Sequence, residues 1–90
     1  MSTTTTTEGE HLAHQFGRRL KELRAERSWS QRDLETKSGI ERGTIFRLEH
    51  GKVGPRLESM NAFAKCFQIT LSELLHGVGH QPVTDPLPVW

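Results

Sequence analysis

Basic side chains are concentrated in the middle of this chain of 90 residues. All 12 lysines and arginines lie between Arg18 and Lys65, together with seven acidic residues, so this segment has a net charge of +5 whereas the whole chain has +1. Such an excess of cationic groups attracts polyanions such as nucleic acids. A solvated helix face has the same composition, so the charge alone leaves both interpretations open.

Histidines offer a second kind of chemistry. His11 and His14 are three residues apart, and His76 and His80 lie near the other end, so a metal-binding or catalytic site can be imagined. However, no cysteine or carboxylate completes a ligand set at a recognisable spacing, and the sequence shows neither a Ser/His/Asp arrangement nor a phosphate-binding glycine loop. We therefore expect no enzyme activity, no metal and no cofactor.

Length and composition narrow the class of protein. Ninety residues suffice for one small domain. No apolar run approaches the roughly 20 residues of a membrane-spanning helix, and residues 1–9 lack the basic start and apolar stretch of a signal peptide. A single cysteine, Cys66, forms no internal disulfide. These features predict a cytoplasmic protein with no membrane segment.

The elements that position the charged residues are all predicted to be helices. Residues 1–9 contain too little apolar surface to fold, and the prolines of residues 79–90 exclude a helix there, so we expect a disordered tail at one end and a Pro-rich extended tail at the other. Residues 10–78 form the predicted domain, with helices at about 10–27, 30–39, 41–50, 56–67 and 71–76. Short connections favour a compact all-α bundle of five helices.

Local signals support these boundaries. Ser30 with Asp33, and Thr70 with Glu73, have the spacing of a capping box at a helix start, and Gly39 allows the left-handed conformation of a helix end. Two helices have long apolar faces. The first helix contributes Leu12, Phe16, Leu20 and Leu23, and the fourth contributes Leu57, Met60, Phe63, Ala64 and Phe67.

The second and third helices have the pattern of a helix-turn-helix motif, in which a tight turn containing glycine joins two short helices. The pattern consists of Gln31, Leu34, Gly39, Ile45 and Leu48. Its apolar members would lock the two helices together, and the outer face of the third helix could then enter a DNA major groove.

At these positions the sequence resembles the Cro- and lambda-repressor-like (XRE-type) helix-turn-helix regulators. The resemblance includes Phe16-Gly17, Trp29-Ser30-Gln31, Ser38-Gly39-Ile40, Thr44-Ile45, Leu48-Glu49, Gly51, Pro55 and the Leu71-Ser72-Glu73-Leu74-Leu75 segment. It implies a five-helix DNA-binding domain. It also implies a transcriptional regulator, such as a repressor, that binds a pseudo-palindromic operator in double-stranded DNA as a homodimer.

The resemblance further implies roles for individual side chains. Gln31, at the start of the second helix, would contact a DNA phosphate. In the third helix, Arg42 and Arg47 would read guanine edges, with phosphate contacts as the alternative, and Phe46 would meet a thymine methyl group. Basic residues around the following loop would clamp the DNA backbone. The expected DNA-binding set is Gln31, Glu41, Arg42, Gly43, Thr44, Phe46, Arg47, Lys52 and Arg56.

Two positions depart from the family pattern, and one pair matches it. Glu35 replaces a small residue that packs against the turn in relatives, so it must swing outward or pair locally. Glu41 replaces the usual Ser or Thr cap of the third helix, where it either contacts a cytosine amino group or faces solvent. Arg24 and Glu49 match positions that form a partly buried ion pair in several relatives, which would fix the angle of the third helix.

The last helical segment contains more apolar residues than it needs. A helix of six residues cannot bury Leu71, Leu74, Leu75 and Val78 against its own bundle, and an unburied apolar patch usually marks a contact surface. Relatives also tend to pair through this region, so we expect the homodimer interface there. The alternative is that these side chains close the core beneath the first helix.

A second function remains open from the sequence. An antitoxin of a toxin-antitoxin pair would bind DNA and also mask a toxin protein. The tail that ends in Pro88-Val89-Trp90 raises this alternative, because an exposed Trp is costly unless it docks on a surface. The tail could dock on a partner, on its own domain, or remain unbound.

Overall fold

The computed structural model describes the backbone of residues 4–80 and the side chains of residues 12–80. In this range the chain forms five helices, α1 (Thr4–Glu26), α2 (Gln31–Ser38), α3 (Arg42–Glu49), α4 (Leu57–Phe67) and α5 (Leu71–Leu74), and no strand. The predicted all-α class and helix order are therefore confirmed. None of these helices is long and apolar enough to cross a membrane.

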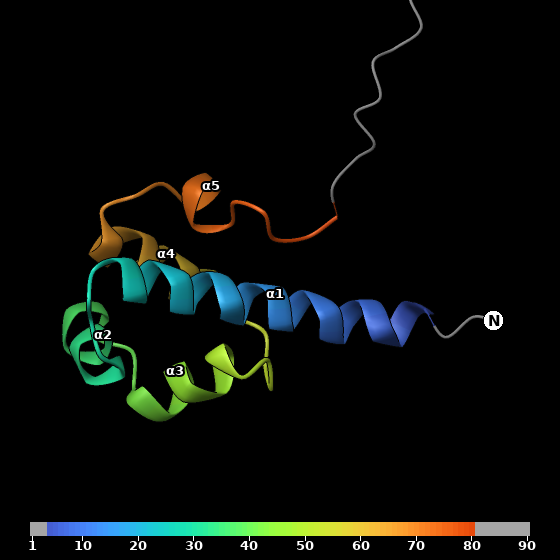
Figure 1. Cartoon of the computed structure of the whole chain (residues 1–90), viewed down its shortest axis with the longest axis horizontal. Helices are drawn as coiled ribbons and strands as arrows, with labels where there is room; N and C mark the ends of the chain where they lie inside the picture. The colour runs from blue at the N-terminus through green and yellow to red at the C-terminus, as the bar shows by residue number, and fades with distance from the viewer. Residues whose placement is uncertain (1–3, 81–90) are drawn as a thin grey trace, which may run out of the picture.

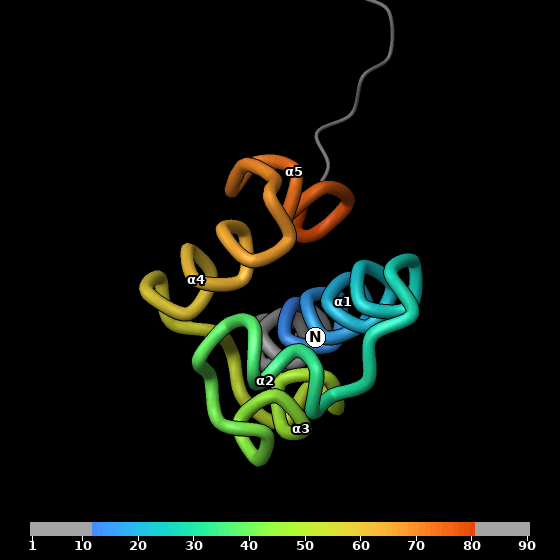
Figure 2. Tube along the Cα trace, turned by 90° about the vertical axis from the view of Figure 1, so that its left-hand side faces the viewer, coloured from blue at the N-terminus to red at the C-terminus, as the bar shows by residue number. Residues whose placement is uncertain are grey.

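Helix α1 is the axis of the structure. It runs the length of the molecule with α2 and α3 on one side and α4 and α5 on the other, as Figure 1 shows from the side and Figure 2 from near its end. The helix contacts α3, and α2 links the two sides by contacting both α3 and α4. This arrangement fixes α3 against the longest helix and leaves its other face on the surface.

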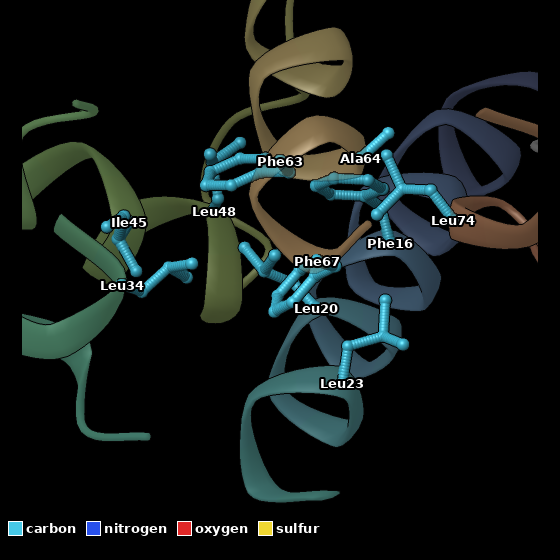
Figure 3. Packing of buried hydrophobic residues seen from close by; sticks show 10 residues of the cluster. All are labelled: Phe16, Leu20, Leu23, Leu34, Ile45, Leu48, Phe63, Ala64, Phe67 and Leu74. Atoms are coloured by element: carbon cyan, nitrogen blue, oxygen red, sulfur yellow. The ribbon is translucent and has the colours of Figure 1, made fainter. Parts of the chain in front are cut away.

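The core lies where the five helices meet (Figure 3). Leu34 of α2 and Ile45 of α3 pack together at one end, which joins the two short helices as predicted, and Phe16 and Phe63 bring α1 against α4 with ring centroids 6.5 Å apart. The buried apolar residues are Phe16, Leu20, Leu23, Leu34, Ile45, Leu48, Phe63, Ala64, Phe67 and Leu74.

Both predicted capping boxes form. Ser30 Oγ accepts a hydrogen bond from the Asp33 amide at 3.0 Å, and the Ser30 amide donates to Asp33 Oδ2 at 2.9 Å. Thr70 and Glu73 repeat this arrangement at the start of α5. At the end of α2, Gly39 has a φ of 79°, which lets the chain reverse directly into α3. Both capped helix starts were predictable because their hydrogen bonds join residues that are close in sequence.

The ends of the domain differ from the prediction. Helix α1 begins at Thr4 rather than near residue 10, so the predicted disordered tail 1–9 is helical from Thr4. Extending a helix that is already anchored fixes one residue for each hydrogen bond gained, which costs far less than nucleation. Helix α5 is one turn long and ends at Leu74, before the predicted His76. Of the predicted tail 79–90, residues 81–90, including Trp90, lie outside the described residues.

Two residues of the predicted apolar faces lie outside the core. Leu12 is 48% exposed and Leu57 is 66% exposed. Both lie toward the N-terminal end of their helix, beyond the buried positions Phe16 and Phe63. The helical spacing of the apolar residues is correct, but no neighbouring helix covers these two positions fully.

Candidate nucleic-acid interface

Helix α3 divides its side chains between the core and the surface. Ile45, Leu48 and Glu49 are buried. On the opposite side, the exposed residues are Arg42, Gly43, Phe46 and Arg47, and Thr44 is half-buried beside them. The helix therefore presents two guanidinium groups and an aromatic ring on one outward face, held by an apolar face that packs into the bundle.

Contacts along this outward face hold its side chains in place. Arg47 Nη2 donates to Thr44 Oγ1 at 3.2 Å. Phe46 is 45% exposed, and its ring centroid lies 4.0 Å from that of His50, which is one helical turn away. The His50 Nδ1 atom lies 2.9 Å from the Phe46 carbonyl oxygen. We did not identify His50 from the sequence, although the spacing of four residues on a helix predicts such a contact.

A bidentate ion pair fastens α3 to α1. Arg24 donates from Nε to Glu49 Oε2 at 2.7 Å and from Nη2 to Glu49 Oε1 at 2.8 Å. The Glu49 side chain is fully buried, and the hydrogen bonds to its carboxylate raise the pKa of Arg24. The remaining Arg24 nitrogen, Nη1, donates to the Trp29 carbonyl at 2.9 Å. The pair therefore joins α1, the loop before α2, and α3.

Gln31 belongs to the same network. Its side-chain amide donates to Glu49 Oε1 at 3.0 Å, so the first residue of α2 is tied to the last residue of α3. The sequence suggested a phosphate contact for Gln31 and no role in this network. An amide nitrogen has two hydrogens, so the contact with Glu49 leaves one donor for a further acceptor.

One hydrogen bond accounts for both departures from the family pattern, Glu35 and Glu41. Glu41 occupies the N-cap position of α3 and makes no side-chain capping bond. Glu35 of α2 reaches across the turn instead, and its Oε2 accepts from the Arg42 amide at 3.1 Å. Of the two alternatives for Glu35, the structure shows local pairing. The sequence did not reveal this cap because its acceptor lies seven residues before the helix.

The basic residues of the predicted backbone clamp lie between α3 and α4 in the chain. Lys52 lies in the loop that follows the helix, where its amide donates to the Arg47 carbonyl at 2.9 Å. Arg56 is the N-cap residue of α4. Both side chains are exposed, so they are free to turn toward a ligand that lies against α3.

The residues predicted to form a dimer interface do not lie together on the surface. Leu74 is fully buried in the core, so its place in the interface was wrong: the short α5 does bury this side chain against its own bundle. Leu71, Leu75 and Val78 are half-buried. Leu75 and Val78 line an apolar groove of about 430 Å³, whose other lining residues are Leu12, Ala13, Phe16, Gly54, Pro55 and Met60.

The histidines do not assemble a metal site in the described part of the chain. Among the described side chains, no group of three His, Cys, Asp or Glu residues is close enough to hold a metal ion. The side chain of His11 lies outside this set.

Comparison with known proteins gives consistent matches. A family model described as "Helix-turn-helix" matches residues 20–74. The transcriptional activator BcrR of Enterococcus faecalis is 33% identical over 63 residues, which cover 70% of this chain and 31% of BcrR. The transcriptional regulator DdrOP3 of Deinococcus deserti is 37% identical over 60 residues, which cover 67% of this chain and 46% of DdrOP3. The chain thus matches less than half of the length of these two relatives.

A solved structure matches at the level of the fold. The crystal structure of the restriction-modification controller protein C.AhdI from Aeromonas hydrophila has a TM-score of 0.66 and 32% sequence identity. The match covers 69% of this chain and 94% of C.AhdI. The helical arrangement seen here is therefore similar to nearly the whole of that controller protein.

Proposed function

Because the chain belongs to the helix-turn-helix family of Cro- and lambda-repressor-like DNA-binding proteins, we propose that it is a sequence-specific transcriptional regulator. It binds a pseudo-palindromic operator in double-stranded DNA as a homodimer and acts in the cytoplasm, where that DNA lies. The observation that carries this proposal is the outward face of α3, which combines Arg42, Phe46 and Arg47 with a rigid attachment to the bundle.

The side chains on α3 suit the major groove. A guanidinium group donates two parallel hydrogen bonds, which match O6 and N7 of guanine, and an aromatic ring packs against the methyl group of thymine. Arg42 and Arg47 take the first role and Phe46 the second. Thr44 supports Arg47, and Gly43 adds no side chain that would hold the helix away from the bases. Glu41 is exposed at the start of α3, beside the DNA major groove, where its carboxylate can accept a hydrogen bond from a cytosine amino group.

Groups beside α3 suit the DNA backbone. Gln31 begins α2, whose N-terminal amides and positive dipole end attract a phosphate. Lys52 and Arg56 are exposed in the segment between α3 and α4. These backbone contacts orient the protein on the DNA without reading its sequence, whereas the base contacts from α3 determine which DNA sequence is bound.

A single copy of α3 reads too few base pairs to select one site in a genome, so two copies are needed. The apolar groove that includes Leu75 and Val78 is the surface that we propose for pairing. A symmetric pair would place its two α3 helices about one DNA turn, roughly 34 Å, apart.

Selection of binding sites from random duplex DNA, followed by footprinting, tests the proposal. We expect an inverted repeat protected on one face of the duplex. With roughly four to six phosphate contacts per subunit, the slope of log affinity against log salt for a dimer should have a magnitude of about 7 to 11. Enrichment of no sequence, or binding that is independent of salt, would refute the proposed function.

A further inference from the structure

We propose that Glu35 of α2 is a positioning residue for DNA recognition, which holds the N-terminal end of α3 at the angle needed to read bases. This inference rests on the proposed function and adds a residue to it. The hydrogen bond from the Arg42 amide to Glu35 Oε2, at 3.1 Å, is the observation that carries it.

Among the described side chains, Glu35 is the one that caps the N-terminal end of α3. The first amides of a helix have no partner within the helix, and Glu41, which occupies the N-cap position, makes no side-chain bond to them. Glu35 supplies an acceptor from the preceding helix. Because this bond crosses the turn, it constrains the angle between α2 and α3, which a cap from Glu41 would not do.

Several contacts hold the turn, and the bond from Glu35 is the one that reaches the N-terminal end of α3. Leu34 and Ile45 lie together in the core, the Gly39 amide donates to the Glu35 carbonyl at 2.8 Å, and the Ile40 amide donates to Ser38 Oγ at 3.1 Å. Beside Gly39 there is open space, since a side-chain carbon added there would meet no atom within 4 Å. The other end of α3 is held by Arg24 and Gln31 through Glu49. Each end of α3 therefore has a carboxylate that ties it to a neighbouring helix.

The carboxylate of Glu35 also affects the kind of DNA contact that α3 makes. An uncapped helix N-terminus attracts a phosphate regardless of base sequence. Glu35 occupies the Arg42 amide and places a negative charge beside it. Sequence-independent attraction at this end of α3 is thereby reduced, and the side chains of α3 determine which DNA is bound.

The test compares Glu35→Ala with Glu58→Ala, which removes the same charge from an exposed position on α4 that lies outside the proposed DNA-contact set. Affinities are measured for the selected operator and for unrelated duplex DNA at one salt concentration. We expect Glu58→Ala to leave the ratio of the two affinities near the wild-type value, because a change in overall charge acts on both affinities alike. Glu35→Ala should lower the ratio about fivefold or more, and Glu35→Gln, which keeps an acceptor oxygen, should restore much of it.

A second measurement needs no DNA. Hydrogen exchange of the Arg42 amide in the full chain should be about fivefold faster in Glu35→Ala, as expected for a lost N-cap, and unchanged in Glu58→Ala. A purely structural role would lower both DNA affinities together and leave their ratio unchanged. Equal ratios, or equal Arg42 exchange, in the two alanine variants would overturn the inference.

The outcome for the wild-type protein separates this inference from the proposed function. A wild-type chain that prefers no DNA sequence would refute the proposed function, and the positioning role with it, even where Arg42 exchange shows the cap. A wild-type chain that selects an operator, with Glu35→Ala selecting it equally well, would refute the positioning role alone.

Discussion

Glu49 is the residue on which the attachment of α3 depends. Its carboxylate is fully buried and accepts hydrogen bonds from Arg24 and Gln31. A buried charge is tolerated only when partners compensate for its lost hydration, so removing one partner costs more than removing the pair. The same contacts set the position of the last turn of α3, which links stability to DNA binding.

Replacing Arg24 and Glu49 by leucine, singly and together, measures this coupling. Arg24→Leu should lower the free energy of unfolding by about 3 kcal/mol, because it leaves the buried carboxylate of Glu49 without its main partner. The double variant should lose less than the sum of the single losses. Urea denaturation gives all three values, and strict additivity would show that the two side chains do not act as a pair.

Arg47 and Lys52 should separate base reading from backbone contact. Arg47→Ala should weaken operator binding by about 1 to 3 kcal/mol and relax the preference at one base position, whereas Lys52→Ala should weaken all sequences alike and reduce the salt slope by about one. Binding assays on operators changed at single positions measure both effects. Indistinguishable sequence profiles for the two variants would contradict these roles.

The sequence predicted single residues well where a local pattern determined their place. The outward set on α3 was implied by the family resemblance, and the Ser30 and Asp33 cap follows from a spacing of three. It did not predict that Glu35 caps α3 or that Gln31 contacts Glu49. Those bonds join different helices, so they depend on the distance and angle between helices, which no local pattern contains.

At the scale of elements, the contact between α1 and α3 depends on a glycine. A side-chain carbon at Gly17 would lie 2.4 Å from the Leu48 carbonyl oxygen and 2.7 Å from that of Glu49, both of which belong to backbone that cannot easily move. The two helices therefore approach each other more closely than any larger residue would allow. This close approach also brings Arg24 within reach of Glu49.

Gly17→Ala should consequently push α1 and α3 apart. We expect a loss of about 1 to 3 kcal/mol or more in the free energy of unfolding, as for other insertions into a packed core. Gly43→Ala is the matched control, because its added carbon would meet only Arg47 Nη1, at 3.6 Å, and alanine favours a helix by up to about 1 kcal/mol. Thermal unfolding of both variants checks this, and equal stability would contradict the close contact.

The capping box of α2 should give the protein a specific acid sensitivity. The hydrogen bond from the Ser30 amide lowers the pKa of Asp33 below its ordinary value of 3.8, with the Ser30 side chain adding to the effect. A carboxylate whose pKa is lowered by folding stabilises the fold above its unfolded-state pKa, and this contribution is lost as the pH falls through the folded value.

Asp33→Asn should therefore be less stable than the wild type at neutral pH, and the difference should shrink as the pH falls below 3.8. Urea denaturation of both proteins at a series of pH values measures this difference. Glu22→Gln, at an exposed position on α1, serves as the control for removal of a carboxylate. A difference between wild type and Asp33→Asn that stays constant down to the acid limit would contradict the role of the cap.

At the scale of the whole molecule, the sequence predicted which helices form and in what order. It did not predict how far the bundle extends. The same spacing places Leu12 and Phe16 on one face of α1, yet Phe16 is buried and Leu12 is half-exposed. Conversely, the one-turn α5 buries Leu74 completely. Burial at the edge of a bundle depends on which neighbouring helix reaches that position, and this is a property of the assembled fold.

The groove formed at that edge is the surface on which dimerisation can be tested. Its residues come from α1, the loop before α4, α4 itself, and the segment after α5, with Leu12, Leu75 and Val78 among them. Leu75→Glu alone would be ambiguous, because Leu75 also packs against the core. Leu12→Glu is the sharper change, because Leu12 is 48% exposed and is not among the buried residues of the core.

We expect the wild-type chain to sediment as a dimer at micromolar concentration and Leu12→Glu to sediment as a monomer with an unchanged circular dichroism spectrum, because a charge in the groove would lose its hydration on pairing. Ala25→Glu is the control, since it adds the same charge at an exposed position on α1 that is 13 residues, or about 20 Å, from Leu12. Leu12→Glu should also bind the operator more weakly, with a smaller salt slope, because each monomer makes only its own phosphate contacts. A wild-type chain that is monomeric even on its operator, or a folded Leu12→Glu protein that is still dimeric, would show that the chain does not pair through this groove.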